Sequence, residues 1–160
     1  MLHRIEQTQV IARPLADVFP FFADAANLGT LTPDTLEFKI LTPLPVEMRE
    51  GALIDYRIRL FGVPLRWRTR IEEWEPGRRF VDVQLAGPYK RWRHTHEFRA
   101  VEGGTEMHDL VEYELPLGPL GAIAYALFVR RTLVGIFDFR RRQVASLFDP
   151  ARAATEQGDG

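Results

Sequence analysis

Two histidines separated by one residue, His94 and His96, are the side chains of this sequence best suited to chemistry. Successive side chains of a β-strand point to opposite faces, so residues two positions apart share a face. Trp92 and Phe98 fall on the face of the two histidines, which predicts that this face is buried. Burying imidazole groups costs free energy unless they are paired, hydrated or used on a ligand. The pattern therefore predicts a buried polar network or a binding site.

Short turn sequences predict how the surrounding strands pair, and which acidic residues join the histidines. The turns are Phe61-Gly62, Pro76-Gly77, Gly87-Pro88-Tyr89 and Gly103-Gly104. Pairing through them places Asp82 opposite His94, and it places Asp109 opposite Phe98. A shorter turn at residues 87–89 would reverse the faces of the preceding strand and would instead bury Val81, Val83 and Leu85.

The inward-facing residues of these strands form the predicted ligand-binding set. They combine aromatic, amide, carboxylate and imidazole groups: Tyr56, Trp67, Asp82, Gln84, Trp92, His94, His96, Phe98, Asp109 and Tyr113. The catalytic candidates are His94, His96 and Asp109, because an imidazole titrates near neutral pH and can act as a general base. The alternative is a hydrogen-bonded network that only helps to specify the core.

The spacing His94-x-His96 also suits two metal ligands on one strand face, with Asp82 or Asp109 as the third ligand. A His-x-His strand of this kind resembles that of cupins, but the distance to the next glutamate is too long. No further histidine follows on this face, because His108 is expected on the opposite one. We therefore expect neither a metal nor a cofactor.

The elements that position these residues follow a simple order. Strands are expected at residues 3–11, 38–41, 52–60, 63–74, 79–86, 90–100 and 105–115, with short helices at 15–22 and 24–31. A long helix is expected over 119–148, because Pro119 suits a first helical turn and apolar residues recur at helical spacing. Those apolar residues are Leu120, Ile123, Leu127, Val134, Phe137, Val144 and Leu147. The apolar first half of this helix suits a helix enclosed by a sheet, so the fold class is α+β.

Composition limits the function classes. The chain has 160 residues, a formal net charge of -1 and no cysteine, which excludes disulfides and thiolate catalysis and gives no sign of nucleic-acid binding. Outward-facing arginines alternate with glutamates, which favours a solvated sheet face. The N-terminal residues lack the apolar segment of a signal peptide, and the apolar run at 115–129 is too short to span a bilayer. We expect a single cytoplasmic domain at 1–150 and a disordered tail at 151–160.

Three segments resemble a known superfamily. They are Ala12-Arg13-Pro14-Leu15-Ala16-Asp17-Val18-Phe19, Trp74-Glu75-Pro76-Gly77-Arg78-Arg79-Phe80, and Gly87-Pro88-Tyr89 followed by Trp92, His94, His96 and Phe98. With the element order over residues 3–148, they resemble the START/Bet v 1-like (SRPBCC) superfamily, and in particular its bacterial polyketide cyclase/dehydrase-like and coenzyme Q-binding-like branches. The resemblance implies a helix-grip fold, in which a curved antiparallel sheet wraps around a long C-terminal helix and two short helices follow the first strand.

The resemblance also implies a cavity between the sheet and the C-terminal helix. The predicted function is binding of a small hydrophobic ligand there, such as a lipid, an isoprenoid or quinone, or a polyketide-like molecule. One alternative is a cyclase/dehydratase-like enzyme that uses a cavity histidine as general base. Another is an accessory protein-interaction module. The expected partner is the small apolar ligand, with no nucleic acid and no stable membrane insertion, while the apolar first half of the last helix could contact a second copy in a homodimer.

Overall fold

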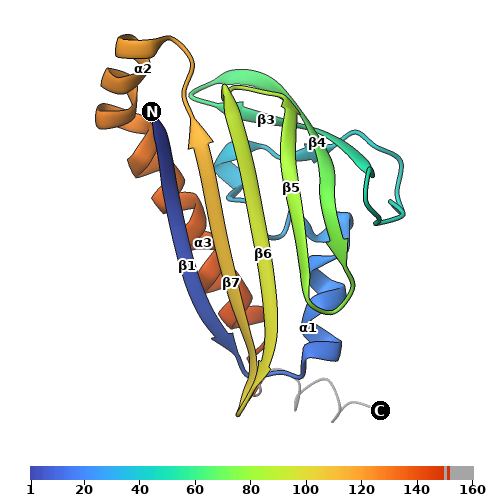
Figure 1. The fold of residues 1–160 in the computed structure, drawn as a ribbon. Coiled ribbons are helices and arrows are strands. Elements are labelled where there is room, and N and C mark those ends of the chain that lie inside the picture. The colour runs from blue at the N-terminus through green and yellow to red at the C-terminus, as the bar shows by residue number, and fades with distance from the viewer. Residues whose placement is uncertain (150, 152–160) are drawn as a thin grey trace.

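The computed structural model describes residues 1–149 and Ala151, which form one β-sheet packed against helices (Figure 1). The strands are β1 (Leu2–Ile11), β2 (Lys39–Ile40), β3 (Leu53–Leu60), β4 (Val63–Glu75), β5 (Arg79–Ala86), β6 (Arg91–Val101) and β7 (Gly104–Glu114). The helices are α1 (Leu15–Phe22), α2 (Gly118–Ala124) and α3 (Arg130–Leu147). The disordered tail predicted at 151–160 lies outside the described residues, apart from Ala151.

The sheet is antiparallel and curved, and its strand order is β1-β7-β6-β5-β4-β3-β2. Figure 1 shows α3 lying along one face of the sheet, with α1 near one end. The predicted α+β helix-grip fold is therefore confirmed. The second short helix, expected at 24–31, is a single 3₁₀ turn at Ala25–Asn27, where the Asp24 carboxylate accepts a hydrogen bond from the Ala26 amide at 2.9 Å.

Three of the predicted hairpin registers are confirmed. Tyr56 pairs with Trp67, and Asp82 pairs with both Ile71 and His94. The β4–β5 hairpin reaches this register by a different route, because Glu75 pairs with Arg79 across a three-residue turn and a bulge between Ile71 and Glu73 compensates for the extra turn residue. A β-bulge adds one residue to one strand, so the two irregularities cancel.

The predicted β6–β7 register is wrong by two residues. His96, and not Phe98, pairs with Asp109, because the turn is at residues 102–103 and not at 103–104. Gly103 takes the left-handed conformation that the turn requires, with φ of 84°. Gly104 already belongs to β7, where a Cβ atom would overlap the carbonyl oxygen of Ile11 on β1. The second glycine therefore serves a close approach between strands, which the local sequence does not reveal.

The helix predicted at 119–148 is interrupted by a π-helical turn at Tyr125–Val129, which separates α2 from α3. Such a turn contains an extra residue and so changes which face the preceding residues present. The buried stripe of α3 consists of Leu133, Phe137 and Val144. Four residues of the predicted stripe are exposed instead: Leu120, Ile123, Leu127 and Val134. The expectation that the sheet encloses the first half of the helix is therefore wrong.

The outward face of the sheet carries paired charges, as the alternation of arginine and glutamate predicts. Arg93 lies 3.1 Å from Glu72 and 2.7 Å from Glu73, and Arg79 lies 2.9 Å from Glu73. Arg93 also donates a hydrogen bond to the Thr95 hydroxyl at 3.0 Å. Ion pairs at a solvated surface contribute little to stability. The main effect of these charged residues is therefore that the outward face of the sheet is hydrated.

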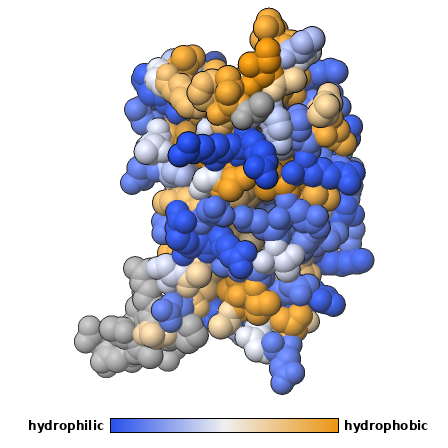
Figure 2. Space-filling model, turned by 90° about the vertical axis from the view of Figure 1, so that its left-hand side faces the viewer, coloured by the Kyte–Doolittle hydropathy of each residue, from blue (hydrophilic) through white to orange (hydrophobic). Residues whose placement is uncertain are grey.

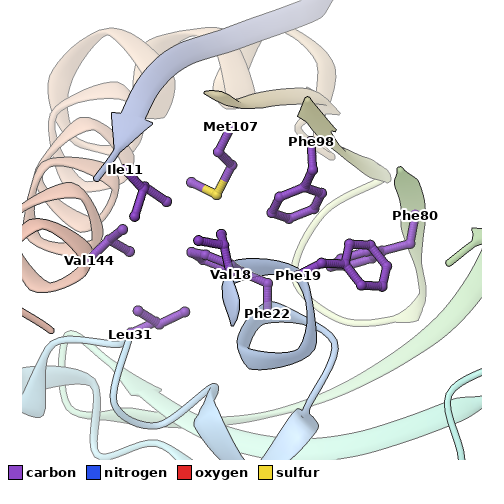
Figure 3. Close-up of a cluster of buried hydrophobic side chains, with 9 residues drawn as sticks. All are labelled: Ile11, Val18, Phe19, Phe22, Leu31, Phe80, Phe98, Met107 and Val144. Carbon is purple, nitrogen blue, oxygen red and sulfur yellow. The ribbon is translucent and has the colours of Figure 1, made fainter. Parts of the chain in front are cut away.

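A hydrophobic cluster fills the end of the molecule near α1. Its side chains come from α1, from α3, from the sheet and, for Leu31, from the segment between the two 3₁₀ turns: Ile11, Val18, Phe19, Phe22, Leu31, Phe80, Phe98, Met107 and Val144 (Figure 3). Phe22, Leu31 and Phe80 also line the cavity described below. The cluster therefore forms the floor of that cavity.

Candidate functional site

A cavity of about 210 Å³ lies between the sheet and α3. Apolar side chains make up most of its wall, including Ile54, Ile58, Ile71, Leu133, Ile136 and Phe137. Polar groups gather at one part of it, where Asp82, His94, His96 and Arg140 reach the wall. A concave, mainly apolar site with a few convergent polar groups is typical of small-molecule binding.

Six of the ten predicted ligand-binding residues line this cavity. They are Tyr56, Trp67, Asp82, Trp92, His94 and His96. The indole of Trp67 stacks on the Tyr56 ring at 5.7 Å and meets Trp92 edge-on at 5.2 Å. Strand alternation therefore placed these six residues on the inward face of the sheet, whereas the remaining cavity lining includes residues of α3 and of the segment 22–38.

The other four predicted residues lie outside the cavity lining. Phe98 belongs to the hydrophobic cluster near α1, and Tyr113 packs with Leu133 and Phe137. Gln84 donates to the carbonyl oxygen of Tyr89 at 2.7 Å and accepts from its amide at 3.3 Å, so it holds the β5–β6 turn. Asp109 is buried behind the two histidines.

The two histidines and two aspartates form a closed polar cluster. Asp109 Oδ1 lies 3.2 Å from His94 Nε2 and, in an ion-pair contact, 2.7 Å from His96 Nδ1. On the cavity side, Asp82 Oδ2 lies 3.0 Å from His96 Nε2 and 3.9 Å from His94 Nδ1. The imidazole centroids are 3.8 Å apart. Each imidazole is therefore placed between two carboxylates, one buried and one on the cavity wall.

The cluster separates the protonation of its two histidines. Burial and the neighbouring His96 lower the pKa of His94 to about 4. Burial also acts to lower the pKa of His96, but the charge of Asp109 and the contacts with both aspartates outweigh it, so this pKa is raised. Near neutral pH, His94 is thus neutral, while His96 holds its proton more tightly than a free imidazole does.

Both carboxyl groups stay ionised for a matching reason. Burial acts to raise the pKa of Asp109, but the charge of His96 and the contacts with both imidazoles hold it well below its usual value. Burial likewise acts to raise the pKa of Asp82, but the hydrogen bond from His96 and the charges of His94, His96 and Arg140 lower it. The cluster therefore carries fixed negative charge at the edge of an apolar cavity.

Arg140 is a charged residue of the cavity wall that is absent from the predicted ligand-binding set. Its guanidinium lies 5.8 Å from the Phe22 ring, and its Nε atom is buried without a hydrogen-bond partner in the described part of the chain. The spacing from Phe137 to Arg140 to Val144 is three residues and then four, which places Arg140 on the buried stripe of the helix. That spacing was available in the sequence.

The cavity opens towards an exposed apolar end of the molecule. A second hollow shares Leu36, Phe61, Thr132 and Ile136 with the cavity wall and therefore marks its mouth. The exposed apolar residues at this end include Phe61 on the β3–β4 turn and Leu127 and Phe128 on the π-helical turn. Figure 2 shows apolar side chains gathered at the end where Figure 1 places α2. The helical run Gly118–Leu147 is, by length and composition alone, long and apolar enough to cross a membrane.

A curved sheet that encloses an apolar cavity against a long helix defines a helix-grip fold. The model of the family "Polyketide cyclase / dehydrase and lipid transport" matches residues 3–148. The chain belongs to this family, and the predicted membership of the START/Bet v 1-like superfamily is confirmed.

Solved structures agree with this fold. A protein from Chromobacterium violaceum has a TM-score of 0.72 at 18% identity, with 92% of this chain and 97% of that chain covered. Ara h 8.0201 has a TM-score of 0.59 at 16% identity, covering 91% and 99%. The di-domain ARO/CYC StfQ from the steffimycin biosynthetic pathway has a TM-score of 0.68 at 17% identity, covering 96% and 53%. None of the curated protein sequences matches this chain.

Proposed function

We propose that this protein binds a small hydrophobic molecule that carries at least one hydrogen-bond-accepting oxygen. One observation carries the proposal: Trp67 Nε1 and Arg140 Nε are both buried, both belong to residues of the cavity wall, and both lack a partner among the described residues. Buried donors in native proteins are nearly always satisfied. A ligand oxygen in the cavity would satisfy them, while the apolar wall would take up the rest of the ligand.

The cavity itself argues for binding over a purely accessory role. An interaction module of this fold is expected to fill its interior with side chains, whereas here about 210 Å³ is left between the sheet and α3. A lipid, an isoprenoid or quinone, and a polyketide-like molecule all combine an apolar body with oxygen atoms. Ligand extraction decides among them.

Mass spectrometry of the protein purified from its own host tests the proposal. Native spectra should show a bound mass, and denaturing extraction should identify it. The Ile136→Trp variant places an indole at the cavity mouth and should abolish the bound mass. Val134→Trp adds the same bulk two residues away, at a position outside the lining, and should retain it. Equal ligand loading of the two variants would contradict binding in this cavity.

A cyclase/dehydratase-like reaction is the second candidate. It is favoured by one feature of the geometry, namely that Asp109 contacts both imidazoles at the wall of an apolar cavity. A base held by a third group is the usual arrangement for proton abstraction beside a carbonyl. If the extracted compound is turned over, His94→Gln should abolish turnover while leaving the compound bound. Unchanged turnover in this variant would remove His94 from the mechanism.

The cytoplasmic location and the homodimer also remain proposals. The cysteine-free sequence fits a reducing compartment, and cell fractionation tests the location. The exposed apolar end fits a contact between two copies, and light scattering after size-exclusion chromatography measures the oligomeric state directly.

A further inference from the structure

We propose that Asp82, His94 and His96 form a binding site for one divalent transition-metal ion, with Zn²⁺ as the reference ion. The inference goes beyond ligand binding in the cavity and does not depend on which organic molecule binds there.

Two of the three donor separations are close to those that such an ion needs. Asp82 Oδ2 lies 3.0 Å from His96 Nε2 and 3.9 Å from His94 Nδ1, and the three donors lie within 4.8 Å of one another. Nitrogen and oxygen ligands of tetrahedral zinc, each at its usual bond length, stand about 3.4 Å apart. The observed distances bracket this value, so small side-chain rotations would complete the site.

Asp109 supplies the support that metal-binding histidines usually have. It contacts the opposite nitrogen of each imidazole, at His94 Nε2 and His96 Nδ1. A ligating histidine commonly directs its second N–H to a carboxylate, which fixes the tautomer and the ring orientation. His94 Nε2 shares a hydrogen bond with Asp109, which leaves His94 Nδ1 facing Asp82, whereas His96 Nε2 shares its hydrogen bond with Asp82 Oδ2. A bound metal would replace the proton of this second hydrogen bond, so that His94 Nδ1, His96 Nε2 and Asp82 Oδ2 would each present a lone pair to the ion. Three lone pairs that converge in this way are stabilised by a cation between them.

The site would keep a position open to the cavity. Asp82, His94 and His96 all line the cavity wall, whereas Asp109 lies behind it. A divalent ion would balance the two carboxylates, and Arg140 would then leave one excess positive charge beside the cavity. The fourth ligand is therefore an anionic oxygen, from hydroxide or from an acidic group of a bound molecule.

Titration of the metal-free protein with Co²⁺ and Zn²⁺ tests this inference. Co²⁺ should bind with a stoichiometry of one and give the visible absorption of a low-coordinate, nitrogen-ligated ion, and Zn²⁺ should displace it. Mg²⁺ should compete poorly, because it prefers an all-oxygen octahedral site. Asp109→Asn should weaken Zn²⁺ binding by roughly 10–100-fold as a positioning residue. Asp82→Asn and His94→Gln, which remove direct ligands, should weaken it further.

His108→Gln is the matched control. His108 lies outside the cluster and contacts Glu6 and Glu97, so it represents a surface site that could hold a metal adventitiously. This variant should bind Zn²⁺ as the unmodified protein does. Circular dichroism should show that every variant is folded before its affinity is compared.

Three outcomes would overturn the inference: no Co²⁺ absorption, an affinity unchanged by both Asp82→Asn and His94→Gln, or binding lost in His108→Gln. The metal-binding test can also succeed or fail independently of the test of the proposed function. Ile136→Trp should lose the organic ligand but still bind one Zn²⁺, because Ile136 lies at the mouth and supplies no donor atom.

Discussion

Asp109 on β7 lies directly opposite His96 on β6, with its Oδ1 atom 2.7 Å from Nδ1 of the imidazole. Both side chains are buried, at 3% relative exposure each. The charge of each group therefore stabilises the charged form of the other. This pair, and not the histidine spacing alone, holds the polar cluster together.

Removing the charge of Asp109 should destabilise the protein. We expect Asp109→Asn to lower the free energy of unfolding of the metal-free protein by about 1–3 kcal/mol, because it removes the buried charge that stabilises the protonated form of His96 and leaves only a neutral amide oxygen as acceptor. Urea unfolding measures the change. Glu106→Gln on the same strand breaks only an exposed pair with Arg99 at 2.8 Å and should cost much less. Equal losses in the two variants would contradict the structural importance of the Asp109 contacts.

Arg140 should contribute to ligand affinity, because its Nε is a buried donor without a partner in the described part of the chain. A hydrogen bond to a charged group contributes about 1.5–3 kcal/mol, so Arg140→Gln should weaken binding of anilinonaphthalene sulfonate by about tenfold or more. This probe combines apolar rings with anionic oxygens, and its fluorescence reports binding. Arg141→Gln changes an exposed neighbour and should leave the affinity unchanged. Equal dissociation constants for the Arg140→Gln and Arg141→Gln variants would exclude Arg140 from the ligand contacts.

Two adjacent glycines should differ in their tolerance of a side chain. Gly103→Ala places a methyl group in open space at φ of 84° and should cost about 1–2 kcal/mol from the left-handed backbone alone. Gly104→Ala should cost more, because its Cβ would overlap the Ile11 carbonyl oxygen of β1. Chemical denaturation of both variants measures the difference. A smaller loss for Gly104→Ala than for Gly103→Ala would be inconsistent with the observed position of the turn.

His108 should titrate above the ordinary histidine value. Its contact with Glu6 raises its pKa from 6.5, so its small contribution to stability is present below pH 6.5 and is lost as the pH rises through the raised pKa. NMR titration should show this pKa, and Glu6→Gln should return it towards 6.5. His3 lies on β1, the strand that carries Glu6, and burial lowers the pKa of His3. The pKa of His3 should therefore not respond to Glu6→Gln, and a response of both histidines would point to a general change of the protein instead.

Sequence alone predicted the buried face of most strands, because side chains alternate with period two whatever the tertiary context. For residues 79–86 it left two alternatives, which depended on the length of the turn at 87–89. It also located three hairpin registers, since their turns contain residues suited to tight turns, and it placed Asp82 beside His94. The superfamily followed from element order together with three short segments. These features depend on contacts that are local in the chain.

Tertiary structure alone decided the pairing of His96 with Asp109. A shift of two residues keeps every side chain on its own face, so hydrophobic patterning cannot distinguish the two registers. The approach of β1 to Gly104, more than 90 residues away in sequence, selects the observed one. The π-helical turn similarly set which residues of the last helix are buried. Whether apolar residues pack as a core or line a cavity depends on the distance between the sheet and α3, which no local pattern encodes.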